Sequence, residues 1–195
     1  MGTDDEDSGD GRLIAWPLER LARVMRAREH EDGLNPAQRE ALRYLARANR
    51  FSNTPGALTR YLGATKGTIS QTVMALERKG FITKAERNAR KAVHLTLTEK
   101  GREVLSRDPW SDLAAAAEDL GGKTRRRMQR GLEQLLAHEL RRSGLASFGS
   151  CGGCRFFREK GRDGDAGGPH LCMLFESPLS AEDTARICFA HEAAD

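Results

Sequence analysis

Apolar residues recur at helical spacing through most of the chain before position 144. The first such segment, residues 12–31, predicts an amphipathic helix with Pro17 in its first turn. Asn35-Pro36 opens a second helix as its N-cap and first helical residue, and the apolar face consists of Ala41, Leu42, Leu45 and Ala48. The pattern predicts a mainly α-helical protein.

The region from Leu58 to Leu105 has the most specific pattern in the chain. Thr54-Pro55 starts a short helix, Gly63 forms a turn, and Thr65 is the expected N-cap of a helix over residues 66–79. The buried stripe of that second helix is formed by Ile69, Val73 and Leu76. Two short helices joined by a tight turn predict a helix-turn-helix.

A β-wing is predicted directly after this motif. Gly80 stops the second helix, and short strands at residues 81–83 and 93–97 flank the polar loop ERNARK. Thr98 caps the next helical region as a bare N-cap, because the third residue after it is not acidic. The basic loop therefore stands where a wing contacts a DNA backbone.

Residues 99–143 are expected to form two helices that break near Gly121-Gly122. The second, residues 123–142, is charged on one side, and its apolar side carries Met128, Leu132, Leu135, Leu136 and Leu140. Neither this helix nor residues 12–31 has an obvious partner inside a small winged domain. Both are expected to form a dimer interface, since two-fold dimers bind paired DNA half-sites; the alternative is that they cover the domain's own core.

The charge distribution favours a polyanionic partner. The net charge of +4 includes five acids and no bases in residues 1–10, and a disordered acidic tail is expected over residues 1–11. Residues 60–91 carry eight bases and two acids. A solvated surface is the commoner explanation of a charge run, but this one coincides with the helix-turn-helix pattern and favours DNA.

The chain resembles the MarR family of bacterial winged-helix regulators over residues 13–143. The resemblance is carried by LNPAQREALRYL, TRYLGATKGTISQTVMALERKGFI and KAVHLTLTEKGREVL. Arg90 matches the later wing arginine of the family, whereas Asn88 stands where another arginine is common. The resemblance implies a homodimer that binds double-stranded DNA at a palindromic operator, usually to repress transcription.

In a helix-turn-helix, the N-terminal residues of the second helix lie near base edges. Lys66 can reach a guanine edge or a phosphate, Gln71 can pair with adenine, and the Thr68 methyl can contact thymine. Taken singly, such residues are also common at ordinary exposed helix positions. The residues predicted to contact DNA are Thr65, Lys66, Gly67, Thr68, Ser70 and Gln71 in the helix and Arg87, Arg90 and Lys91 in the wing.

All four cysteines lie in the last 45 residues, with the spacing Cys-x2-Cys-x17-Cys-x15-Cys. Residues 144–195 bury little apolar surface, so a cross-link is expected to order them as a metal-stapled module. The four thiolates that match the ligand count of structural zinc or of an iron–sulfur cluster come from Cys151, Cys154, Cys172 and Cys188. His191 and His170 are weaker candidate ligands. A thiol–disulfide switch and unrelated buried cysteines are the alternatives.

The choice between the two centres is close. Zinc sites usually present a second close pair of ligands, so the spacing slightly favours an iron–sulfur cluster, which can be shielded by Phe156, Phe157, Leu174 and Phe175. In favour of zinc, ESPLSAEDTARICFAHE is typical of a helix capped by Ser180, which would place Cys188 and His191 one turn apart. With either centre, ordering of the tail can change the spacing of the DNA-reading helices.

Other classes of function receive less support from the sequence. The chain has no apolar run of about 18 residues and no signal-peptide layout, so a cytoplasmic location without a membrane span is expected. No residue set predicts an enzyme active site. The competing hypotheses are a small-molecule-responsive repressor with a structural zinc tail and an interaction module without DNA binding. The expected domains are a tail at 1–11, a winged-helix and dimerisation domain at 12–143 and a cysteine-rich module at 144–195.

Overall fold

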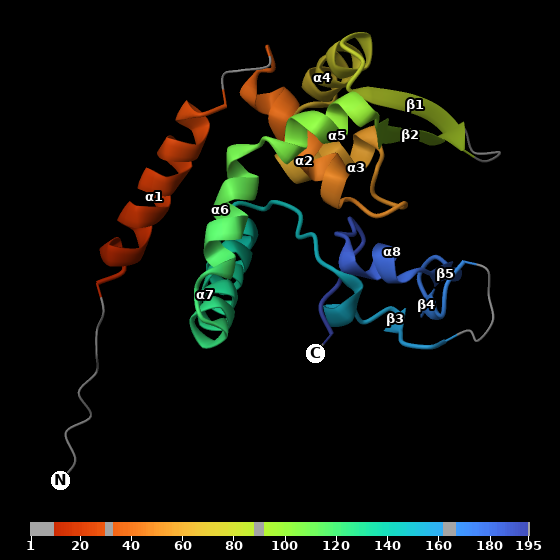
Figure 1. Cartoon of the computed structure of the whole chain (residues 1–195). Coiled ribbons are helices and arrows are strands. Elements are labelled where there is room, and N and C mark those ends of the chain that lie inside the picture. The colour runs from red at the N-terminus through yellow and green to blue at the C-terminus, as the bar shows by residue number, and fades with distance from the viewer. Residues whose placement is uncertain (1–9, 30–32, 88–91, 162–166, 195) are drawn as a thin grey trace.

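The computed structural model of the chain describes residues 10–29, 33–87, 92–161 and 167–194. It consists of a winged helix-turn-helix body, three helices that extend from it, and a small C-terminal module (Figure 1). The extending helices span Arg12–Ala27, Pro109–Glu118 and Gly122–Arg142. In Figure 1 the wing projects at the upper right, the extending helices lie on the other side, and the module, in blue, lies below the body. In the described part of the chain, no helix is long and apolar enough to cross a membrane.

The first helix, α1 (Arg12–Ala27), is shorter than the sequence predicts. It begins at Arg12, whose backbone N–H donates to the Asp10 carboxylate at 3.0 Å. Pro17 therefore lies inside the helix and not in its first turn, which corrects the prediction. The helix ends at Ala27, well before residue 31. At this end the backbone N–H of Arg28 donates to the Met25 carbonyl.

Local caps define the three helices at the centre of the body, as the sequence predicts. Asn35 and Gln38 form a capping box at the first of these helices. Thr54 and Thr65 cap the other two, and Gly63 ends the middle helix with a φ of 59°, a conformation that favours glycine. The helices are α2 (Pro36–Arg47), α3 (Pro55–Leu62) and α4 (Lys66–Arg78), and α3 with α4 forms the helix-turn-helix.

The wing is an antiparallel pair of strands, β1 (Ile82–Arg87) and β2 (Ala92–Leu97). Ile82 pairs with Leu97 and Arg87 pairs with Ala92, so the register is regular along the whole pair. Both strands are longer than predicted, because backbone hydrogen bonds continue into polar residues that carry no alternating pattern. The residues between the two strands, 88–91, lie outside the described residues.

Three helices follow the wing, although the sequence analysis predicts two. The additional break is at Asp108-Pro109, where the Asp108 side chain accepts from the Trp110 N–H and proline takes the first helical position. The break near Gly121 and the bare Thr98 cap are as predicted. The three helices are α5 (Glu99–Ser106), α6 (Pro109–Glu118) and α7 (Gly122–Arg142).

The hydrophobic core lies between α2, α3, α4, α5 and the two wing strands. The predicted stripe of α4 is buried in it at Ile69, Val73 and Leu76. Each fully buried large apolar side chain contributes about 1.5–3 kcal/mol. Because this stripe is packed into the core, the opposite face of α4 must point toward solvent. The largest fully buried apolar side chains are Leu42, Tyr44, Leu58, Ile69, Leu76, Ile82, Leu95 and Leu179.

The C-terminal module contains a three-stranded antiparallel sheet that the sequence pattern does not predict. The strand order is β3-β4-β5. Gly168 has a φ of 119°, and a Cβ there would lie 2.2 Å from the Leu179 carbonyl oxygen, so the turn requires glycine. The elements are η1 (Cys151–Gly153), β3 (Phe157–Arg158), β4 (His170–Cys172), β5 (Ser177–Leu179) and α8 (Ala181–Ala185).

Helix α8 is much shorter than the sequence predicts. Ser180 caps it as expected, in a capping box with Asp183. The helix ends at Ala185, because Ile187 and Cys188 then form backbone bridges with residues far away in the sequence. Cys188 and His191 therefore do not share a helix, which removes that argument for zinc ligation by this pair.

Helices α1 and α7 expose apolar side chains in the single chain. Among the residues of α7 none is buried. Of the large apolar side chains of α1, only Met25 is buried in the described chain. Dimerisation through these faces stays a prediction. The most exposed large apolar side chains on the two helices are Leu13, Ile14, Trp16, Met128, Leu135 and Leu136.

A buried charge network joins the extending helices to the body. Arg43 of α2 lies 2.7 Å from the Glu29 carboxylate and 3.1 Å from the Asp108 carboxylate. Glu29 and Asp108 are 4% and 3% exposed. The Trp110 indole N–H also donates to Glu29 at 3.1 Å. Arg43 is thus the shared cation of two buried carboxylates from the ends of α1 and α6.

Replacing Arg43 with methionine is expected to lower the free energy of unfolding by about 3–5 kcal/mol, because it leaves two buried carboxylates without their cation. Urea unfolding followed by circular dichroism measures this change. Arg107→Met is the matched control, since Arg107 is exposed and its pair with Glu103 is worth at most ~1 kcal/mol. Equal losses in the two variants would contradict the role of the buried network.

Candidate DNA-reading surface and cysteine pocket

The N-terminal part of α4 presents an exposed polar surface. All six residues of α4 and its cap that were predicted to contact DNA are exposed: Thr65, Lys66, Gly67, Thr68, Ser70 and Gln71. Thr65 also has a structural role, because its Oγ1 accepts from the Thr68 N–H at 3.2 Å and lies 2.9 Å from the Thr68 Oγ1. Apart from the backbone of its own helix, a Cβ at Gly67 would meet just one atom of the described residues, Thr65 Oγ1 at 3.8 Å, so this edge of the helix is open to close approach.

The basic residues around this surface are not equivalent. Lys84 forms an ion pair with Glu77 at 2.6 Å, and Lys79 donates to the Gly33 carbonyl at 2.7 Å. The Arg60 guanidinium lies over the Phe189 ring. Lys66 is exposed and forms no hydrogen bond or ion pair with another described residue. The positive charge of this region is therefore partly used inside the fold, and Lys66 stays available to a ligand.

The wing residues predicted to contact DNA fall at the edge of the described structure. Arg87 is the last residue of β1, and its backbone pairs with Ala92. Arg90 and Lys91 lie outside the described residues. The DNA contacts assigned to these three residues stay predictions.

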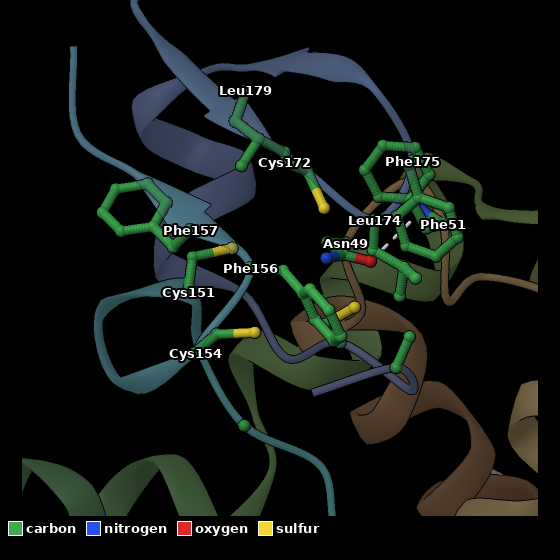
Figure 2. A pocket seen from close by; sticks show the side chains of 13 residues that line it. Asn49, Phe51, Cys151, Cys154, Phe156, Phe157, Cys172, Leu174, Phe175 and Leu179 are labelled. Atoms are coloured by element: carbon green, nitrogen blue, oxygen red, sulfur yellow. Dashed lines mark hydrogen bonds between the residues drawn. The ribbon is translucent and has the colours of Figure 1, made fainter. Parts of the chain in front are cut away.

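The four cysteines line one pocket in the C-terminal module (Figure 2). Cys151 and Cys154 lie at the two ends of the η1 turn, which the Cys154 N–H closes by donating to the Cys151 carbonyl at 2.9 Å. Cys172 ends β4, and the Cys188 N–H donates to the Gly149 carbonyl at 2.9 Å. The remaining wall is mainly apolar and includes Phe51, Phe156, Phe157, Leu174, Phe175 and Leu179.

Burial and mutual proximity raise the pKa of the Cys151 thiol to about 11; burial is the largest cause, followed by Cys188, Cys154 and Cys172. All four cysteines are free thiols. Within the described residues, no group of three or more His, Cys, Asp or Glu side chains has the arrangement of a metal-ion site. The structure thus brings the predicted thiols around one pocket, while the metal staple itself stays a prediction.

The two candidate histidine ligands lie elsewhere in the module. The His191 ring packs over Gly149, where a Cβ would lie 2.8 Å from the ring atoms. The His170 ring lies 5.3 Å from the Phe157 ring, and its Nδ1 faces the Lys160 N–H at 3.4 Å. Neither histidine is among the residues that line the cysteine pocket.

The module packs directly on the loop that joins α2 to α3, residues 48–53. The Ile187 N–H donates to the Arg47 carbonyl at 2.8 Å, and the Ile187 carbonyl accepts from the Asn49 N–H at 3.0 Å. The Phe189 N–H donates to Ser52 Oγ at 2.9 Å. Phe51 stacks on Phe175 with ring centroids 4.3 Å apart.

A second set of contacts ties the same loop to the rest of the molecule. Arg50 pairs with Asp183 at 3.4 Å and also donates to the Pro178 carbonyl. The Tyr44 hydroxyl donates to the Ser52 carbonyl at 2.7 Å, and burial raises the Tyr44 pKa, which keeps this donor protonated. The module that carries the cysteines is therefore packed against the loop that leads into the helix-turn-helix.

Sequence reasoning missed the residues that the body contributes to the cysteine pocket. Asn49 and Phe51 line it, although they lie about a hundred positions before Cys151. The segment ANRFSN carries ordinary loop residues, and no local signal connects it with the cysteines. Only the packing of the module against residues 48–53 reveals this part of the wall.

Comparisons with known proteins agree with the fold. Residues 32–92 match the MarR family model. Similar solved structures include a MarR family protein from Bacillus stearothermophilus, with a TM-score of 0.51 and 23% identity over 66% of this chain and 91% of that chain. A MarR transcriptional regulator from Methanosarcina mazei Go1 has a TM-score of 0.51 and 21% identity over 67% and 98%.

A third similar structure is the S. aureus MepR–DNA complex, with a TM-score of 0.51 and 17% identity over 65% of this chain and 93% of that chain. No curated protein sequence matches the chain. These similarities extend over about two thirds of the chain. The chain thus has a winged helix-turn-helix fold, and its residues 32–92 are similar to the MarR family.

Proposed function

We propose that this protein is a dimeric transcriptional regulator that binds palindromic double-stranded DNA through α4 and the wing. The observation that carries the proposal is the exposed polar N-terminal surface of α4, held outward by a fully buried opposite stripe within a MarR-type body. MepR, a protein of similar fold, has been solved in complex with DNA. The exposed apolar faces of α1 and α7 supply a surface for the two-fold partner.

We further propose that the cysteine pocket holds an iron–sulfur cluster whose presence changes DNA affinity. Four thiols surround an apolar, phenylalanine-lined space, but they are not arranged around a single ion. Four cysteine thiolates are the ligand set of an iron–sulfur cluster as well as of structural zinc, and the phenylalanine-rich wall, which can shield a cluster from water, favours the cluster. Cys151, Cys154, Cys172 and Cys188 would hold the cluster, and their thiolates would supply negative charge to it.

The contacts of the module support its coupling to DNA binding. Cys188 is followed by Phe189, which bonds Ser52 in the loop that leads into α3. The segment that connects α7 to the module inserts Phe148 edge-on against Tyr44 and Tyr61 of the body. A change at the cysteines therefore reaches the helix-turn-helix through packed residues, without passing through the dimer interface.

A second candidate function rests on another cleft. Glu40, Arg43 and Tyr61 of the body and Leu136 and Leu140 of α7 line a groove between the helix-turn-helix and the extending helix. A small organic effector in this groove can bias the relative position of the two parts. In that case the cysteine module is a structural zinc tail.

The deciding experiment is metal and sulfide analysis of protein purified without oxygen, together with its visible spectrum. We expect a brown protein with iron and acid-labile sulfide. DNA selected by the protein from a random pool should then bind the loaded and the stripped protein with affinities that differ about 5- to 150-fold, the usual range for allosteric coupling. A colourless protein with one zinc per chain would favour the effector-binding alternative.

A further inference from the structure

Asn49 places a buried hydrogen-bond donor beside the four cysteines. The residue is 1% exposed and lines their pocket. Its Oδ1 accepts from the Phe51 N–H at 3.1 Å and from Ser52 Oγ at 2.8 Å. Its Nδ2 is buried and has no hydrogen-bond partner among the described residues. Because buried amides are almost always paired in native proteins, this donor indicates an acceptor that the described residues do not provide.

The orientation of the Asn49 amide is fixed by its neighbour. The backbone N–H of Phe51 can only donate, so the side-chain atom that it contacts must be the oxygen. The NH₂ group must then lie on the other side. Figure 2 shows this nitrogen on the side of Asn49 that faces the sulfur atoms of Cys151 and Cys172.

We propose that Asn49 donates from Nδ2 to a sulfur of the centre held by the cysteines, and that its loop transmits the presence of that centre to the wing. The inference rests on the iron–sulfur centre of the proposed function. Thiolate and sulfide sulfurs accept hydrogen bonds, and such bonds help set the reduction potential of a cluster. Asn49 is thus a positioning residue contributed by the DNA-binding body.

The same loop holds the second strand of the wing. The Asn53 carbonyl accepts from the Leu95 N–H at 2.7 Å, and the Asn53 Oδ1 lies 2.7 Å from Nδ1 of His94. Asn53 N–H in turn bonds the Asn49 carbonyl at 3.2 Å. Loss of the centre leaves the Asn49 donor buried without an acceptor, which raises the free energy of the protein. A shift of residues 49–53 that lets this donor find another acceptor would also move β2, because Asn53 is bonded to Leu95.

The test uses the full-length protein loaded with iron and sulfide, with Asn49→Asp and Asn49→Ala variants. Aspartate keeps the oxygen that accepts from Phe51 and Ser52 but replaces the donor, and alanine removes the donor without adding charge. Dithionite titration followed by visible absorption should give a lower midpoint potential for both, because the hydrogen bond favours the more negative reduced state. The ratio of DNA affinities between loaded and stripped protein should fall to about 1.

Asn35→Asp is the matched control, since it makes the same chemical change at an exposed N-cap of α2 that does not line the cysteine pocket, and aspartate is an equally good cap. Its midpoint potential should equal that of the wild type. If an Asn49 variant loses the centre altogether, and its stripped form has the same melting temperature as the stripped wild type, the loss also supports a hydrogen bond from Asn49 to the centre. Unchanged midpoints and an unchanged affinity ratio in both variants would overturn the inference alone. A wild-type protein that takes up no iron and sulfide would overturn the proposed centre and this inference together.

Discussion

Replacing Cys154 and Cys172 together with alanine abolishes the metal response of DNA binding in our proposal. The two residues belong to different elements of the module, η1's end and β4, so their loss removes ligands from two parts of the pocket. We expect no bound iron or sulfide and an affinity for selected DNA that no longer changes about 5- to 150-fold with loading. Metal analysis and fluorescence anisotropy on the same preparation measure both effects.

Met173→Ala is the control for this double variant. Met173 follows Cys172 directly, is exposed, and does not line the pocket. It should retain both the centre and the response. A double variant that keeps a full complement of iron and sulfide would show that these cysteines are not ligands, and one that keeps the DNA response without the centre would separate regulation from the module.

The single variants Lys66→Ala and Gln71→Ala are expected to weaken DNA binding in two different ways. A bidentate glutamine–adenine pair is worth about 1–3 kcal/mol of discrimination, so Gln71→Ala should reduce affinity for selected DNA by roughly 5- to 150-fold without weakening binding to random DNA. Lys66→Ala removes an exposed positive charge at the start of α4, which no described residue neutralises. It should weaken binding to selected and to random DNA alike. If Lys66 contacts a phosphate, the slope of log affinity against log salt should fall by about 0.9.

Gln129→Ala provides the comparison. Gln129 is an exposed glutamine on α7, far from α4 in sequence, and it bonds only its neighbour Glu133 among the described residues. It should leave DNA affinity and salt slope unchanged. Wild-type affinity that does not depend on salt would contradict DNA binding altogether and favour a protein-interaction module.

The packing of the module changes the expected route of regulation. The sequence order, with the cysteines after the last long helix, suggested that the tail acts through the dimerisation helices. The structure instead seats the module on residues 48–53, between α2 and α3. In the function that we propose, a signal that arises at the cysteines would reach the helix-turn-helix over a few side chains, without a prior change in the spacing of the two subunits.

Local chemistry determined most of what could be predicted. Asn35, Thr54, Thr65, Thr98 and Ser180 were all predicted as N-caps, and each side chain accepts the expected backbone N–H. These interactions span three residues, so the sequence specifies them without reference to the fold. The buried stripe of α4 followed in the same way from helical periodicity.

The helix break at Asp108-Pro109 has such a local signal, a cap residue followed by proline, but the apolar spacing continues across it and predicts an unbroken helix. The length of α8 had none. Its sequence favours a longer helix, but Ile187 and Cys188 are taken into backbone bridges with Ala48 and Gly149. Tertiary pairing overrides local preference there, because buried backbone groups must be paired wherever the chain comes to lie.

By itself the sequence determined the helix-turn-helix, its wing and the identity of the four thiols, because caps, periodicity and cysteine spacing are short-range properties. Only the tertiary structure decided that the thiols face one pocket, that Asn49 and Phe51 complete its wall, and that the pocket lies against the loop before α3. These contacts join residues about a hundred positions apart, and their existence depends on which surfaces bury each other when the chain folds.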